Sequence, residues 1–152
     1  MKTLSRPHVK ADVLRRLRTL RPDSARQWGR MSAHQMVCHL SDAFLMDTDQ
    51  KPVSHASGVR ERTIFKWIAL YTPLRWPPGI RTRPEVDQEV GGTKPTAFAA
   101  DLASLEALVE AVTTRPDFFA GRRHPIFGSL SKAAWMRWGY LHMDHHLRQF
   151  GV

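Results

Sequence analysis

The C-terminal segment 131–152 places the strongest constraint on the fold, because apolar residues occupy more than half of its helical circumference. It reads SKAAWMRWGYLHMDHHLRQFGV. With His142 at zero and about 100° per residue, His146 falls near 40° and Trp135 near 20°. The adjoining flank, from about 80° to 160° on the same wheel, carries Met136, Tyr140, Met143, Leu147 and Phe150. This pattern predicts a helix that lies largely within the core.

The histidines of this helix fall on two different parts of the wheel. His142 and His146 face the same way as the aromatic residues, and two imidazoles at i and i+4 are suited to one metal ion. His145 falls at about −60°, beside the polar strip. We therefore expect His145 at the rim of the site as a hydrogen-bonding neighbour, with metal ligation as the less favoured role. The polar strip consists of Arg137, Asp144 and Arg148.

A capping box predicts the start of a second helix with an inward-facing histidine. Ser32 and Gln35 have the spacing of that motif, which places a helix over residues 33–47. On this helix His39 lies on a largely apolar side, with Asp42 beside it. A lone histidine in such a place is more often a hydrogen-bonded core residue than a ligand. A metal-binding role for His39 therefore depends on the final helix lying next to it.

The rest of the chain has the periodicity of an all-α protein. Helical spacing predicts a first helix over 10–20, a shorter helix over 62–71 and a further main helix over 96–114. Segment 74–90 contains proline and tryptophan without a regular period, and we interpret it as a long irregular crossover. No strand pattern of useful length occurs. The sequence thus predicts an all-α bundle that forms one domain over residues 1–152.

Other residues are expected to have structural roles. His124 should anchor the loop 118–130, and Ser131 should be the N-cap of the final helix. Cys38 is expected to be inert packing rather than a nucleophile. The expected core aromatics, for which the wall of a substrate pocket is the alternative, are Trp135, Trp138, Phe98 and Phe65. The histidines expected at the surface are His8, His34 and His55.

The chain is strongly basic, with a net charge of +9. Seventeen of its 23 basic residues are arginines, spread from Arg6 to Arg148. A nucleic-acid-binding protein more often shows a clustered basic stripe or a known reading motif. A solvated basic surface is therefore favoured over nucleic-acid binding. A small anionic substrate is also consistent with this charge.

The composition also bears on the compartment. The single cysteine, Cys38, excludes an internal disulfide and favours a reducing cytoplasm. The apolar runs are too short for a transmembrane helix, and residues 1–20 lack the apolar core of a secretory signal. We therefore expect a cytoplasmic protein without a membrane partner.

Three histidines on two inward faces lead to a metal-site hypothesis. If the two helices are neighbours, His39, His142 and His146 can meet one divalent ion, and imidazole suits zinc, nickel, copper or iron. Three protein ligands leave one position open for water or a thiol, as in catalytic sites. Asp42 and Gln149 are candidates for orienting the imidazoles, and Asp42 also for direct ligation. The alternative is a histidine cluster held by hydrogen bonds alone.

Two segments carry a resemblance to a known group of proteins. MSAHQMVCHLSDAF, which follows Trp28, and HMDHHLRQFG resemble the DinB-like (DinB/YfiT) superfamily. The segment HPIFGSLS is similar to a subfamily of unknown function within it. The resemblance implies a four-helix bundle with a long connection between its second and third main helices. It also implies a divalent metal, zinc or nickel foremost, held by His39, His142 and His146.

The resemblance implies a class of activity without naming a substrate. Superfamily relatives include thiol-dependent transferases and isomerases, so we expect a metal-dependent thiol (S-)transferase-type enzyme acting on a small electrophilic substrate, or a related hydrolase. A low-molecular-weight thiol would be the second cofactor. A non-catalytic metal-binding or stress-response bundle is the main alternative, and a homodimer is one state open to such a bundle. No catalytic residue is assigned by the sequence.

Overall fold

The computed structural model describes residues 1–48, 50–55, 58, 61–80 and 82–152, and these residues form an all-α protein. The prediction of an all-α fold is confirmed. Two short turns of other helix types, Glu61–Phe65 and Pro84–Val86, lie between the second and fourth helices. The α-helices are α1 Pro7–Leu17, α2 Ala33–Leu45, α3 Lys66–Tyr71, α4 Phe98–Thr114 and α5 Lys132–Gln149.

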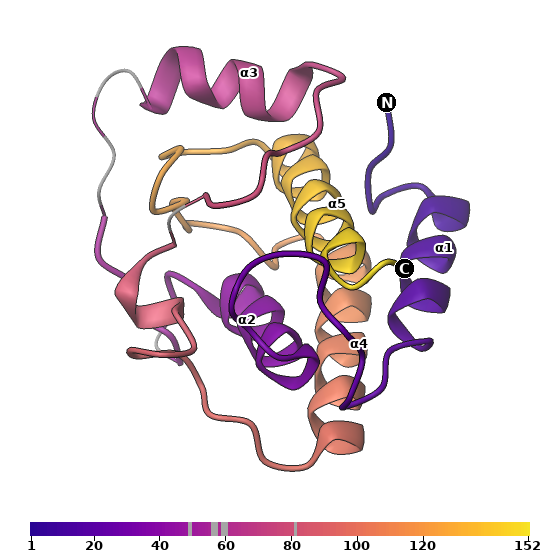
Figure 1. Cartoon of the computed structure of the whole chain (residues 1–152). Helices are drawn as coiled ribbons and strands as arrows, with labels where there is room; N and C mark the ends of the chain where they lie inside the picture. Colours follow the sequence, from indigo (N-terminus) through magenta and orange to yellow (C-terminus); the bar gives the residue numbers. More distant parts are fainter. Residues whose placement is uncertain (49, 56–57, 59–60, 81) are drawn as a thin grey trace.

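The helix α5 is the centre of the arrangement (Figure 1). It contacts α1, α2 and α3, and α2 also packs against α4. Figure 1 shows α3 apart from α1, α2 and α4, next to one end of α5. No helix in the described part of the chain is both long and apolar enough to cross a bilayer. The packing of α2 beside α5 meets the condition on which the metal-site hypothesis depends.

Side-chain caps fix where the two histidine-bearing helices begin. The Ser32 hydroxyl accepts the Gln35 backbone N–H at 3.1 Å, and the Gln35 side chain accepts the Ser32 backbone N–H at 2.8 Å. The predicted capping box is therefore confirmed. Ser131 caps α5 by accepting the Ala134 N–H at 3.2 Å, as predicted. These caps set the register of the residues that follow them on each helix.

Helix boundaries differ from the predicted ones by a few residues. The first helix begins at Pro7 rather than 10, because proline is well suited to the first helical position, where its missing N–H is no loss. It ends at Leu17 rather than 20. The main helix expected from 96 begins at Phe98, because the backbone of Ala97 is extended rather than helical, and the Thr96 N–H donates to the Asp101 carboxylate at 2.9 Å. The helix expected to reach 47 ends at Leu45.

The core is built around the N-terminal half of α5. Trp135 is 1% exposed and stacks in parallel on Phe119 at a centroid separation of 4.3 Å. Gly139 lets α5 approach other parts of the core, because an added Cβ would lie 2.9 Å from Leu4 and 3.1 Å from Phe44. Trp138 is also buried, as predicted. The extensive burial predicted from the helical wheel is confirmed.

Two predictions of burial on or near α3 and α5 are wrong. Phe65, expected in the core, is 55% exposed, because α3 is short and buries only Leu70. Arg137, expected on a polar strip, is buried. Its guanidinium donates to the Leu70 carbonyl at 3.0 Å and to the Lys2 carbonyl at 2.8 Å. It thus ties the end of α3 and the N-terminal segment to α5.

Candidate metal centre

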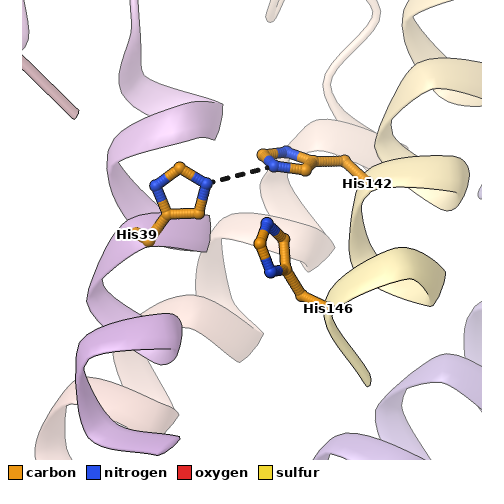
Figure 2. Close-up of side chains that lie close together, drawn as sticks. All are labelled: His39, His142 and His146. Atoms are coloured by element: carbon orange, nitrogen blue, oxygen red, sulfur yellow. Dashed lines mark hydrogen bonds between the residues drawn. The ribbon is translucent and has the colours of Figure 1, made fainter. Parts of the chain in front are cut away.

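The three predicted ligands meet between α2 and α5 (Figure 2). His39 projects from α2, and His142 and His146 project from successive turns of α5. One ring nitrogen from each lies within 4.8 Å of the others. The Nε2 atoms of His39 and His142 are 3.2 Å apart. The structure therefore brings all three imidazoles together around one point.

Hydrogen bonds on the far side of two rings determine which nitrogen faces this point. His39 Nδ1 is 2.8 Å from the Val86 carbonyl oxygen, which can only accept, so Nδ1 carries the proton. The Nε2 of His39 is then left with its lone pair directed at His142. A backbone carbonyl behind a histidine is a common way to orient a metal ligand.

Gln149 performs the same task for His146. Its Nε2 donates to the Trp28 carbonyl at 2.8 Å, which leaves Oε1 to accept from His146 Nδ1 at 2.8 Å. The Nε2 of His146 is therefore free of a proton. The predicted orienting role of Gln149 agrees with this contact. Two of the three imidazoles are thus fixed in the tautomer that metal binding requires.

Burial keeps the three imidazoles neutral. Desolvation is the main cause that lowers the pKa of His39, and it lowers the pKa of His142 and His146 well below the ordinary value. The neighbouring imidazoles lower the pKa values of His142 and His146 further. Neutral imidazoles have an available lone pair, so protons compete only weakly with a cation at neutral pH.

The spacing of the nitrogens fits a shared ion. Two nitrogens that each lie about 2.0–2.1 Å from zinc in a tetrahedral site are roughly 3.3 Å apart. The observed separation of His39 Nε2 and His142 Nε2 is 3.2 Å. Because His39 Nε2 carries no proton, the hydrogen bond across this gap is donated by His142 Nε2. This separation fits a shared divalent ion, and the third imidazole offers a nitrogen within 4.8 Å of the other two.

Asp42 does not orient an imidazole, the role for which the sequence made it a candidate, because its carboxylate binds other groups. Its carboxylate accepts from the backbone N–H of Thr93 at 2.8 Å and from Gln88 at 3.1 Å, and it pairs with Lys51 at 3.2 Å. None of its hydrogen bonds in the described structure goes to an imidazole. Asp42 instead ties α2 to the segment before α4. The backbone carbonyl of Val86 has the orienting role for which Asp42 was a candidate.

His145 is buried, so its predicted place at the rim is wrong. It is 6% exposed, and its ring lies 6.0 Å from that of Trp28 and 6.2 Å from that of Trp76. Burial is the main cause that lowers its pKa. The two tryptophans come from irregular segments and cover a flank of α5 that a helical wheel leaves open. His145 also contacts the ring of His146 at 5.0 Å, which makes it a neighbour of the cluster.

Trp76 contacts His142 and also lines a surface cavity of about 540 Å³. The cavity is lined by Trp76 together with Arg75, Arg137 and Arg148. The Trp76 ring lies 6.1 Å from that of His142, and its Nε1 donates to the Ala69 carbonyl at 2.9 Å. His142 is only half-buried, unlike the other two histidines. His142 is therefore the most exposed of the three, and Trp76 packs against it.

The Gln149 contact leads to a prediction for metal affinity. Gln149→Leu removes the acceptor for His146 Nδ1–H, so the ring loses its fixed tautomer and orientation. We expect the affinity for zinc or nickel to fall by about 10–100-fold, as is usual when a partner of a ligating histidine is lost. Competition titration with a chromophoric chelator measures this change. Asp42→Asn is the control, and an equal loss of affinity in that variant would contradict the assignment.

His124 lies outside the cluster and anchors the loop before α5. Its Nδ1 accepts the backbone N–H groups of Ile126 and Phe127 at 3.2 and 3.1 Å, and its ring packs against Trp138 at 5.0 Å. The predicted anchoring role is confirmed. Burial lowers the pKa of His124 from 6.5 to about 3, with a smaller contribution from His55.

This shift predicts a pH dependence of stability. Because the folded pKa lies below the unfolded one, the unfolded state binds a proton first as the pH falls from 6.5. Stability is therefore present above that pH and is lost below it, by about 1.4 kcal/mol per pH unit between pH 6 and 4. His124→Asn keeps an acceptor without titrating, so its unfolding free energy should fall less steeply. The measurement is the free energy of unfolding by denaturant at a series of pH values, with a substitution of an exposed histidine, His8→Asn, as control. Parallel pH curves for the wild type and both variants would contradict this prediction.

The other expected structural residues are placed as follows. His8 and His55 are exposed, as predicted, whereas His34 is half-buried and contacts Asp101. Cys38 is buried. Burial and the nearby Asp101 raise the pKa of its thiol to about 12, which agrees with its not being a nucleophile.

Sequence comparison assigns the chain to a family. The family described as a protein of unknown function (DUF1569) matches residues 4–151, which is almost the entire chain. The protein belongs to this family. Among curated proteins nothing matches, and the comparison with solved structures also gave no match.

Proposed function

We propose that this protein is a divalent-metal-binding bundle of the DinB-like superfamily that acts as a metal-dependent thiol transferase. One observation carries the proposal: three neutral imidazoles, two of them buried and that of His142 half-buried, converge from two helices, with the Nε2 atoms of His39 and His142 3.2 Å apart. Fixed acceptors behind His39 and His146 support it. Membership of the DUF1569 family is consistent with the superfamily proposal.

The packing of the helices supports the bundle part of this proposal. We assign α1, α2, α4 and α5 as its four main helices. The segment between Leu45 and Phe98 would then be the long connection between the second and third of them, and α3 is part of that segment. This topology allows the second and last main helices to be neighbours, as bundle metal sites require.

The residues around the cluster suit a thiol and an acidic or electron-poor substrate. A divalent ion at this site would supply a position at which a thiol or water is activated by a lowered pKa. His39, His142 and His146 would hold the ion, with Val86 and Gln149 orienting two of them. Arg75, which is exposed and lines the cavity with Trp76, offers positive charge to the carboxylate groups that small thiols commonly carry.

Cobalt spectroscopy tests the thiol part of the proposal. In Cys38→Ser protein the chain has no thiol of its own, so any thiolate signal comes from an added one. We expect cysteine or glutathione to produce a thiolate-to-cobalt charge-transfer band and to shift the visible bands of the cobalt-loaded protein. A spectrum unchanged by either thiol would contradict transferase chemistry of this type.

Depth of burial favours one alternative, a metal that only stabilises the bundle. His39 and His146 are 4% and 8% exposed, so only the side of His142 is open to a ligand. A non-catalytic site would have no exchangeable position. In that case the protein would bind cobalt tightly, and added thiol would not change the spectrum of the bound ion.

A further inference from the structure

A second group of metal-ligating side chains lies between α2 and α4. His34 and Cys38 are four residues apart on α2, so they project from the same face of that helix. Asp101 lies in the first turn of α4 and reaches both of them. Its Oδ2 atom is 2.7 Å from His34 Nε2 and 3.7 Å from Cys38 Sγ. One ligand atom from each residue lies within 4.8 Å of the others.

The surroundings hold these side chains in place. The Asp101 carboxylate accepts the Thr96 backbone N–H at 2.9 Å and the Thr96 hydroxyl at 3.1 Å. The His34 ring packs edge-on against Phe98 at 5.3 Å. The Cys38 side is buried, whereas the side chains of His34 and Asp101 are 17% and 23% exposed. The group is therefore accessible to an ion from solvent on the side of His34 and Asp101, and shielded from water on the side of Cys38.

We infer that His34, Cys38 and Asp101 form a second divalent metal site, of the zinc class, which joins α2 to α4. Thiolate, imidazole and carboxylate are the ligand types that zinc prefers. A thiolate and a carboxylate together balance the two charges of the ion, and the imidazole adds none. On binding, the Cys38 thiol releases its proton to solvent, and His34 turns a proton-free nitrogen toward the ion. Water would complete the fourth position.

This site is independent of the proposed histidine centre. Cys38 and His39 are neighbours in sequence, but they face about 100° apart on α2. Cys38 therefore points to α4 while His39 points to α5. A metal here would bridge α2 and α4, so it would be expected to stabilise their contact. Its presence requires neither catalysis nor a thiol cofactor.

Cobalt binding to the wild-type chain tests the inference, because Cys38 is the only cysteine. Metal-free protein is titrated with Co²⁺ in the absence of added thiol. We expect a near-ultraviolet thiolate-to-cobalt charge-transfer band that saturates at about one equivalent for this site. Cys38→Ser should abolish the band, Asp101→Asn and His34→Ala should weaken Co²⁺ binding at this site, and His142→Ala should leave the band intact.

Two outcomes would overturn the second site. One is a wild-type protein that binds cobalt without any charge-transfer band. The other is a band that keeps its full affinity in both Asp101→Asn and His34→Ala, which would mean that the thiol binds cobalt alone. A measurement on the wild-type protein does not depend on whether the variants fold. Zn²⁺ should slow the alkylation of Cys38 by N-ethylmaleimide, a rate that mass spectrometry measures. An unchanged alkylation rate would likewise count against the site.

Discussion

His142→Ala is expected to weaken the binding of zinc or nickel at the histidine centre by more than about 100-fold, the upper end of the cost of losing only an orienting partner. The substitution removes one of three imidazoles whose nitrogens meet at one point. The two that are left, His39 and His146, would have to bind the ion with one more water. Competition titration in a Cys38→Ser background isolates this centre from the second site.

His145→Ala is the matched control for this prediction. His145 is another histidine of α5 and is buried, and its ring touches that of His146, but it is not one of the three converging ligands. Its removal should change the metal affinity far less than that of His142. If both variants lost the ion equally, the centre would depend on the general packing of α5 and the assignment of ligands would be wrong.

Trp135→Ala is expected to lower the free energy of unfolding by about 3–5 kcal/mol, as large-to-small changes of buried tryptophan do. Trp135 is 1% exposed and packs against Phe119 and Trp138 at centroid separations of 4.3 and 5.4 Å. The cavity left behind would be too large for these rings to fill. Since the net stability of a domain is only about 5–15 kcal/mol, this variant should be marginally folded.

Chemical denaturation in the presence of a chelator measures this effect without a contribution from bound metal. Trp67→Ala provides a control with the same change of side chain, because Trp67 is 62% exposed. Its effect should stay within about 0.5 kcal/mol. If both variants lost the same free energy of unfolding, the burial of Trp135 would not be what stabilises the fold.

The parts of the site that follow from helical periodicity could be predicted from the sequence. Once a segment is a helix, the residues on one face are fixed, and this places His142, His146 and Gln149 together. The same reasoning predicted the inward side chain of His39. The strong caps at Ser32 and Ser131 made these two helices easy to delimit.

The parts that depend on irregular segments could not be predicted. Trp28 and Trp76 bury His145, yet neither belongs to an α-helix, and periodicity says nothing about where they lie. The acceptor behind His39 is the backbone carbonyl of Val86, a group that every residue has. Phe65 has helical spacing, which predicts a core residue, but it ends the short turn Glu61–Phe65, and the helix α3 that follows buries only Leu70.

The His34, Cys38 and Asp101 group was missed for another reason. The prediction of a surface position for His34 and of inert packing for Cys38 considers each residue of α2 separately. Asp101 lies 63 residues after Cys38, so only the pairing of α2 with α4 brings it near. The i, i+4 spacing of His34 and Cys38 was the one local signal, and it matches the spacing of His142 and His146.

Elemental analysis tests the central claim most directly. Cys38→Ser protein is purified without chelator, incubated with Zn²⁺ or Ni²⁺ and freed of unbound metal, so that the histidine centre is the site under test. We predict about one equivalent of divalent metal per folded chain, and almost none when His142 is also replaced by alanine. A folded chain that takes up no metal, or one that keeps its metal without His142, would contradict the account.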